Sequence, residues 1–296
     1  MVLQRNNPIP VWGWTQPGNT VSVSFTGETN QTTAADSSGF FKVTFPSRTV
    51  SSDPLILGAC DSSGCVSLLG VLVGDVILCS GQSNTEFNVA SSNNASEEIA
   101  AAGNFPLIRV TSGPLQGQFN LHTLPVNVLF PELQALDLPW SLANKESIGG
   151  NGKGWDYYSA VCWFYLRDTF LANQAAGEVV PLGGVVQCYG GTSIQWWSST
   201  EALAQCPLSA SNPGSACCGY GGNSSCLYNS QIHPYTLGPM QFSAVFWYQL
   251  SLPPSFSLSH FTPPPPFPHS PPYPPSHPII YISEGNRMQG VVAPPN

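Results

Sequence analysis

Charged side chains are scarce in this sequence. Only 8% of its 296 residues are Asp, Glu, Lys or Arg, about a third of the roughly 25% that is usual for soluble proteins. The net charge is −8, and eight scattered Lys and Arg residues cannot form a basic stripe along a phosphate backbone. We therefore expect no nucleic-acid partner, and a surface covered by Ser, Thr, Asn, Gln and glycan.

The sequence also lacks a long hydrophobic run and a leader peptide. Its most apolar stretch, residues 66–79, is too short to span a membrane and contains Asp75. Met1 is followed by VLQRNNP rather than by a basic and then an apolar segment. Nine cysteines and three Asn-x-Ser/Thr sequons, at Asn30, Asn94 and Asn223, nevertheless favour the secretory pathway, although a sequence rich in Ser, Thr and Asn also produces sequons by chance. We expect a secreted or lysosomal protein whose signal peptide is absent from this chain, with no membrane span.

Residues 1–69 have the pattern of short strands separated by turns. Val21, Val23 and Phe25 alternate with Ser22 and Ser24, which is typical of a half-buried strand. A turn sequence at 36–39 precedes a second strand pattern at 40–45. This region of the chain is predicted to be a small antiparallel, β-sandwich-like domain.

From residue 70 to residue 249 the pattern changes to alternating strands and helices. Continuous apolar runs predict strands buried on both faces, and Gly103 and Gly177 end two helical stretches. The strands are expected at 68–79, 182–188 and 244–248, and the helices at 95–102 and 158–176. The pattern predicts a three-layer α/β domain with a mainly parallel sheet. Ligands bind such sheets at the carboxyl ends of the strands.

Residues 250–278 contain twelve prolines and no charge. Neither the helices nor the sheet of an α/β domain can use such a sequence, which predicts an extended, disordered Pro-rich segment over 250–282. Residues 283–296 remain as a short C-terminal remnant.

Small residues follow each predicted buried strand. Cys79-Ser80-Gly81-Gln82-Ser83-Asn84 follows the first, and a tight turn there can hold the Ser83 hydroxyl clear of the sheet. The second strand is followed by residues 189–197, YGGTSIQWW, and the third by Gln249. Taken singly, each is also an ordinary polar loop; together they form a candidate site.

Seven stretches in this chain resemble the sialate O-acetylesterases, a family of SGNH-type serine esterases. In chain order over residues 1–249 they are MVLQR, VWGW, GDVILCSGQSN, SAVCWF, YGGTSIQWW, LYNSQIHP and VFWYQ. The resemblance implies a β domain joined to a flavodoxin-like SGNH hydrolase domain. It also implies removal of O-acetyl groups from sialic acids without a metal or organic cofactor.

The resemblance assigns roles to individual residues. Ser83 would be the nucleophile, and its N–H, with that of Gly190 or Gly191 and with Asn286, would form the oxyanion hole. Substrate-binding roles fall to Gln82, Asn84, Thr192, Trp196, Trp197 and Gln249. The two tryptophans are equally typical of core aromatics.

Four further residues near these motifs have a structural interpretation that competes with a functional one. Asp75 lies early on a buried strand, and His233 precedes the third strand. Arg109 is typical of a surface cation, and Glu86 of a stabilising acid in the first turn of a helix.

The chain departs from the family in its third loop. The family continues WYQ with Gly-Glu-x-Asn, whereas Gln249 is followed here by Leu250. Ser283-Glu284-Gly285-Asn286 resembles the missing continuation. Our hypothesis is that residues 250–282 are foreign to the fold, most simply an intron translated in frame.

The Asp-x-x-His motif that supplies the catalytic base of the family is absent. The five histidines, at 122, 233, 260, 269 and 277, are each preceded three positions earlier by a residue other than Asp. A serine without a positioned base is a poor nucleophile. We expect this chain to be an impaired esterase. The alternatives are a non-catalytic carbohydrate-binding protein and an esterase acting on other acetylated polysaccharides.

The cysteines show no zinc-site spacing. Because nine is an odd number, at least one thiol must be free, and Cys79 or Cys188 on a buried strand is the expected one. Disulfides are expected among the cysteines of the Gly/Ser-rich loop, which are Cys206, Cys217, Cys218 and Cys226.

Overall fold

The computed structural model describes residues 1–114, 128–150, 158–205, 225–236 and 241–249, and the backbone of 283–284 and 288–289. The predicted Pro-rich segment and Asn286 lie outside the described residues. Among the described residues the fold is α/β, as predicted, with a nine-stranded mixed sheet and a separate two-stranded antiparallel sheet. A second strand pair, β12 (Ser283–Glu284) with β13 (Met288–Gln289), is antiparallel as well.

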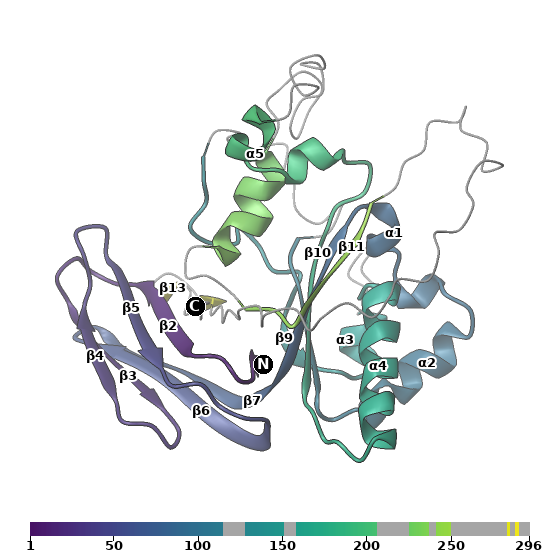
Figure 1. Ribbon diagram of the computed structural model, residues 1–296, viewed down its shortest axis with the longest axis horizontal. Helices are drawn as coiled ribbons and strands as arrows, with labels where there is room; N and C mark the ends of the chain where they lie inside the picture. Colours follow the sequence, from purple (N-terminus) through teal and green to yellow (C-terminus); the bar gives the residue numbers. More distant parts are fainter. Residues whose placement is uncertain are drawn as a thin grey trace.

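The long strand β7 (Gly64–Gly81) runs through the whole molecule (Figure 1). Its first half pairs antiparallel with β6 (Ser51–Asp61). Its second half lies between β10 (Leu182–Cys188) and β11 (Ala244–Tyr248), parallel to both. The strand continues past residues 69 and 70, where its register against β6 shifts, so the β-rich region and the α/β region share a sheet.

The β-rich region contains the short strands predicted before residue 69. In the large sheet, β3 (Thr20–Phe25) lies between β4 (Gln31–Ala34) and β6, and β1 (Val2–Gln4) runs parallel to β7. The second sheet pairs β2 (Ile9–Trp14) with β5 (Phe40–Phe45). Val21, Val23 and Phe25 are buried, and Phe25 packs edge-on against Phe45 of the other sheet. The predicted alternation is therefore confirmed as the buried face of β3.

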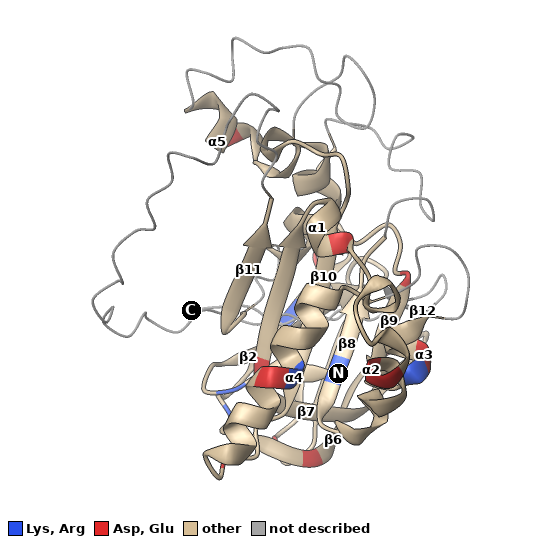
Figure 2. Cartoon of the chain, turned by 90° about the vertical axis from the view of Figure 1, so that its right-hand side faces the viewer, with Lys and Arg blue, Asp and Glu red and all other residues tan. Residues whose placement is uncertain are grey.

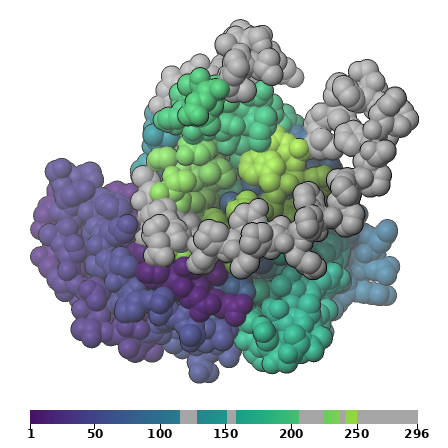
Figure 3. Space-filling model, in the orientation of Figure 1, coloured from purple at the N-terminus to yellow at the C-terminus, as the bar shows by residue number. Residues whose placement is uncertain are grey.

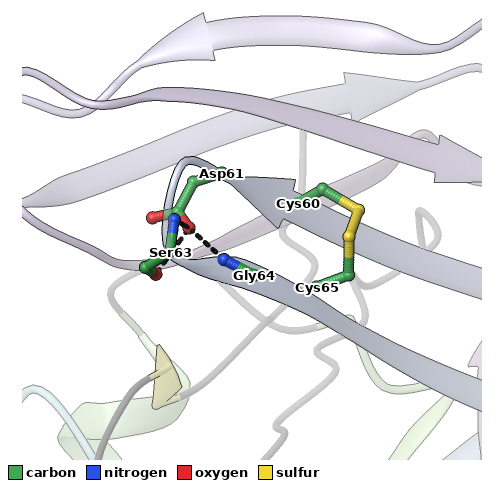
Figure 4. The surroundings of a disulfide bond; sticks show 5 residues. All are labelled: Cys60, Asp61, Ser63, Gly64 and Cys65. Atoms are coloured by element: carbon green, nitrogen blue, oxygen red, sulfur yellow. Dashed lines mark hydrogen bonds between the residues drawn. A yellow bond between two sulfur atoms is a disulfide. The ribbon is translucent and has the colours of Figure 1, made fainter.

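A tight hairpin joins β6 to β7 and is closed by a disulfide between Cys60 and Cys65 (Figure 4). Asp61 Oδ1 accepts hydrogen bonds from the N–H of Ser63 (2.8 Å) and of Gly64 (3.2 Å). Burial alone would raise the pKa of Asp61, but hydrogen bonds from Ser63, Thr15 and Asn19 outweigh it and hold the pKa below its ordinary value.

In the α/β region the strand order is β11, β7, β10, β8 and β9. β8 (Ile108–Ser112) runs parallel to β10, whereas β9 (Leu138–Leu142) is antiparallel at the edge. The parallel core is as predicted, but β8 and β9 were not expected from the sequence. With the antiparallel β-rich region, the complete sheet is mixed.

Helices α2 (Ala95–Ala101), α3 (Lys145–Gly149) and α4 (Ala160–Ala175) lie together beside the sheet (Figures 1 and 2). The two helices predicted from the sequence correspond to α2 and α4. A Cβ atom on Gly184 of β10 would lie 2.4 Å from Leu166 Cδ1 and from Tyr158 Oη, so glycine allows α4 to approach the strand closely. In Figure 2 only a few short stretches of these helices carry the colours of charged residues.

The remaining helical segments are short. Single turns lie at Val89–Ser91, Ala102–Asn104 and Ile194–Trp197, followed by α5 (Thr200–Ala204). A π-helix at Tyr228–Ile232 continues into a turn at His233–Tyr235. Tyr235 and the nearby Phe242 belong to the same core cluster as Leu78 of β7 and Val185 of β10. The turn at His233–Tyr235 and the nearby Phe242 therefore add to the core that contains Leu78 and Val185.

A second disulfide, Cys79–Cys162, links β7 to α4. Cys79 and Cys188 were both expected as the free thiol. The expectation is wrong for Cys79, whose partner lies on α4, whereas Cys188 is buried and free among the cysteines that the structure describes. Cys226 is also disulfide-bonded. Cys206, Cys217 and Cys218, the other cysteines for which disulfides were expected, lie outside the described residues. Disulfides are typical of proteins that fold in an oxidising compartment. No helix in the described ranges is long and apolar enough to cross a membrane.

Candidate active site

The three loops predicted to carry a site begin at the same end of the sheet, where β7, β10 and β11 have their carboxyl ends. In the strand register, Gly81 at the end of β7 pairs with Cys188 of β10 on one side and with Tyr248 of β11 on the other. Backbone hydrogen bonds extend this alignment past the strands, from Tyr189 N–H to Gly81 O (3.2 Å) and from Gln82 N–H to Tyr248 O (3.2 Å). The carboxyl ends of the three strands therefore bring the candidate residues together.

Gly81 makes the turn into the first loop. Its φ is +142°, and a Cβ atom there would lie only 2.1 Å from Tyr248 O, so no other residue fits without moving β11. After Gly81 the buried Gln82 precedes α1 (Ser83–Glu86). Ser83 and Asn84 are exposed at the start of this helix. The start of α1 thus places Ser83 in an exposed position beyond the carboxyl end of β7.

Thr85 fixes the other side of the α1 turn. Its Oγ1 lies 3.2 Å from the carbonyl oxygen of Ser80 and 3.1 Å from that of Tyr248, and the side chain is fully buried. The turn that carries Ser83 is therefore bonded to both β7 and β11.

Glu86 links α1 to the glycine loop that follows β10. Its side chain is 4% exposed, and its Oε2 accepts a hydrogen bond of 2.7 Å from the backbone N–H of Gly190. That N–H is thus engaged by a carboxylate. Gly191 is exposed and adopts a φ of +73°. Of the two glycines considered for an oxyanion hole, Gly191 is the one whose surroundings are open.

Thr192 connects the glycine loop to the third loop. Its Oγ1 donates to Tyr189 O (2.7 Å) and accepts from the indole Nε1 of Trp197 (2.9 Å). The backbone oxygen of Thr192 accepts from Nε2 of Gln249 (2.8 Å). Thr192 is buried, so its observed contacts position the two loops relative to each other.

The two tryptophans of the glycine loop differ in environment. Trp197 is 5% exposed and packs in a small cluster with Tyr189 and with Cys226 and Leu227 from the segment 225–236. Trp196 is half-buried against the same cluster, and its Nε1 lacks a hydrogen-bond partner among the described residues. Trp197 therefore contributes mainly to packing beneath the loop.

His233 contacts Phe130 and Tyr228. Its Nδ1 lies 2.9 Å from the backbone oxygen of Phe130, and its ring packs near Tyr228. These contacts favour the structural interpretation. The other four histidines lie outside the described residues, as does Asn286.

Asp75 and Arg109 also have structural surroundings. Both carboxylate oxygens of Asp75 accept hydrogen bonds of 3.0 Å from the Arg5 guanidinium, and Gln4 donates a further one of 3.1 Å. Arg109 donates to the backbone oxygen of Pro106 (2.6 Å), and burial lowers its pKa. Across the described residues no group of three or more His, Cys, Asp or Glu side chains is placed to hold a metal ion.

Two residues at this edge were missed or underrated by the sequence reasoning. Glu86 was interpreted mainly as a helix-stabilising acid, and Trp247 of β11 was not singled out. The signal for Trp247 was present, because alternation along residues 244–248 places its side chain on the opposite face from Phe246. The contact between Glu86 and Gly190 joins segments 104 residues apart and had no sequence signal.

Comparison with solved structures finds a protein with a similar fold. A carbohydrate acetylesterase from Xanthomonas citri superposes with a TM-score of 0.61 and 28% sequence identity, covering 84% of this chain and 48% of that one. The mixed α/β architecture is therefore similar to that of a carbohydrate acetylesterase.

Sequence comparison identifies the particular relatives. The sialate O-acetylesterase of Homo sapiens is 35% identical over 182 residues, which are 60% of this chain and 31% of the human protein. The mouse sialate O-acetylesterase is 32% identical over 220 residues, 70% of this chain and 37% of that protein. No family model matches the chain. The predicted resemblance to sialate O-acetylesterases is confirmed, over a chain that spans about a third of the length of these relatives.

Proposed function

We propose that this chain belongs to a serine esterase that removes acetyl groups from acetylated sugars, with Ser83 as the nucleophile. The observation that carries the proposal is the convergence of three loops at one sheet edge, where Ser83 is exposed between the ends of β10 and β11. The homology to sialate O-acetylesterases makes O-acetylated sialic acid the first substrate to test.

In the proposed reaction, Ser83 Oγ bonds to the acetyl carbon and its proton moves to a base. The bond between the acetyl carbon and the sugar oxygen then breaks, and the sugar oxygen takes up a proton. Water hydrolyses the acetyl-enzyme to acetate and regenerates Ser83. Backbone N–H groups of Ser83 and Gly191 would hold the developing oxyanion, each typically contributing about 10²–10³ in rate. Asn286 remains a third proposed donor.

The base is the missing component of this proposal. His233 bonds to Phe130 O, and the sequence contains no Asp-x-x-His. Loss of a triad member typically lowers turnover by roughly 10⁴–10⁶. We therefore propose that this chain by itself is an impaired esterase.

The proposed surroundings of the reaction follow from the same residues. Asn84 and Gln249 at the loop ends would contact the sugar, whereas the buried Gln82, Thr192 and Trp197 would hold these loops in position.

We propose that the chain is divided into a β-sandwich-like domain over 1–69 and a flavodoxin-like SGNH domain over 70–249. The disulfides are compatible with a secreted or lysosomal location.

A fluorophosphonate probe tests the nucleophile directly, because it bonds covalently to activated serines. We expect slow labelling of the intact chain at Ser83, located by peptide mass spectrometry, and no labelling of Ser83→Ala. Ser63→Ala, which removes a serine from the distant hairpin, is the control and should label like the wild type. Labelling at other serines, or none at Ser83, would contradict the proposal.

The second candidate is a non-catalytic carbohydrate-binding protein. It is favoured by the missing base together with an aromatic-rich loop edge containing Trp196, Trp197 and Trp247. Binding of an acetylated sugar without labelling of Ser83 would support it. An esterase for other acetylated polysaccharides is distinguished by comparing hydrolysis of acetylated xylan with that of O-acetylated sialic acid.

A further inference from the structure

We infer that Trp247 is the platform on which the sugar ring of the acetylated substrate stacks. This inference rests on the proposed function, since it assigns a sugar-contacting residue to the same site. The sequence-based assignment placed substrate contacts at Trp196 and Trp197, and the structure adds a third tryptophan that packs against Trp197.

The side chain of Trp247 points toward the glycine loop. Trp247 pairs with Ser80 in the strand register, one position before Tyr248 at the end of β11. Its neighbour Phe246 turns to the other face, where its ring lies 6.4 Å from that of Tyr165 on α4. The ring centroid of Trp247 lies instead 5.4 Å from that of Trp197, at an interplanar angle of 88°.

The indole of Trp247 is also held in place. Its Nε1 donates to Gln249 Oε1 (3.2 Å), and Gln249 Nε2 donates to Thr192 O (2.8 Å). Trp197 makes an edge-to-face contact with Trp247, and its Nε1 also donates to Thr192 Oγ1 (2.9 Å). Trp247 is therefore linked to Thr192 both through Gln249 and through Trp197. A side chain fixed by its neighbours before binding loses little conformational entropy when a ligand arrives.

The ring remains accessible to a ligand. Trp247 is 38% exposed, whereas Trp197 beneath it is 5% exposed. Figure 3 shows part of the yellow-green surface of residues 241–249 on this face of the molecule. Trp247 is therefore more exposed than a core residue, and the buried Trp197 packs against it.

The chemistry of this surface suits a sugar. Pyranose rings present C–H groups on one face and hydroxyl groups at their edges, so they fit a rigid aromatic surface flanked by polar groups. Gln249 and Asn84 supply such groups at the same sheet edge. The described loop residues 81–86 and 189–197 contain no Lys or Arg, so the exposed side chains of these two loops offer stacking and neutral hydrogen bonds.

The test is binding, which does not require a catalytic base. The intact chain is titrated with the methyl glycoside of 9-O-acetyl-N-acetylneuraminic acid and followed by calorimetry. We expect Trp247→Ala to weaken binding by about tenfold and Trp247→Phe by less, because Phe keeps a smaller ring. Tyr165→Ala is the matched control: Tyr165 is 42% exposed but lies on the α4 side of β11, and its loss should leave affinity unchanged.

Each outcome separates this inference from the proposed function. Two results would overturn the platform and leave the proposed function standing. One is wild-type affinity for the sugar in Trp247→Ala. The other is a wild-type chain that binds no sugar although its Ser83 reacts with the fluorophosphonate. Trp247-dependent binding without Ser83 labelling supports the platform and contradicts the esterase. If Trp247→Ala also lowers the melting temperature, its loss of affinity could reflect partial unfolding, and Trp247→Phe is then the decisive variant. A Trp247→Phe chain with the melting temperature and the sugar affinity of the wild type would count against the platform.

Discussion

Glu86 is a buried carboxylate whose hydrogen bond ties the Ser83 helix to the glycine loop. Glu86→Ala leaves the Gly190 N–H buried without its acceptor, which costs about 1–3 kcal/mol. We expect the free energy of unfolding, measured in urea, to fall by that amount. Glu86→Gln keeps an acceptor oxygen and should lose less.

The control for this prediction is Glu97→Ala, which removes an exposed acid from α2. Its effect on unfolding should stay within about 0.5 kcal/mol. Equal effects of the Glu86 and Glu97 substitutions would show that the hydrogen bond contributes nothing to stability.

Asp61 makes a prediction about acid stability. Hydrogen bonds hold its pKa below the ordinary value in the folded chain. A carboxyl whose pKa is lower in the folded than in the unfolded state stabilises the fold above the unfolded pKa of about 4, and this stabilisation is lost as the pH falls below it. We expect the free energy of unfolding to fall between about pH 5 and pH 2, and to fall less in Asp61→Asn. Parallel pH profiles for the two proteins would refute this role.

At the scale of elements, the two described disulfides close loops of very different length. Cys79–Cys162 spans 83 residues and Cys60–Cys65 spans 5. In the chain-entropy model, removing the first costs about 4–5 kcal/mol and removing the second about 2 kcal/mol. We expect Cys79→Ser/Cys162→Ser to destabilise the chain more than Cys60→Ser/Cys65→Ser in urea unfolding. The reverse order would show that local packing, not loop closure, governs their contribution.

The elements that could be predicted from the sequence are those with an unbroken apolar pattern. β10 and β11 have the predicted bounds because their runs are continuous, and α4 ends before Gly177 as its helix-stop signal indicated. β6 was missed because Pro54 and Gly58 interrupt a weak alternation, and burial is supplied by β3 and β7 on either side. Edge strand β9 was missed because Pro139 interrupts the alternation of Leu138, Trp140 and Leu142, and proline within such a run is tolerated mainly on an edge strand.

The candidate site was predictable only to the level of its loops. Strand ends placed Ser83, Gly190 and Gln249 at one edge, since parallel strands in register end together. Hydrogen bonds such as Glu86 to Gly190 depend on loop conformations that no local pattern encodes. The roles of Ser83, Gly191 and Asn286 in an oxyanion hole stay predictions.

At the scale of the whole molecule, β7 joins the β-rich region and the α/β region in a single hydrogen-bonded sheet. We expect the two regions to unfold together. Native-state hydrogen exchange should give amides of β3 and β10 the same limiting free energy of opening. A clearly lower value for β3 would show that the β-rich region opens as an independent unit.

The continuity of β7 also determines which changes in length the gene can accept. An extra codon at the hairpin tip, between Ser62 and Ser63, adds a residue to an exposed turn and leaves the pairing intact. The same codon inserted between Val71 and Leu78 would turn every following side chain to the other face of the sheet. Cys79 would then point away from Cys162, and the turn at Gly81 would no longer meet Tyr248. Insertions and deletions among homologues should accordingly gather at the hairpin and avoid the strand.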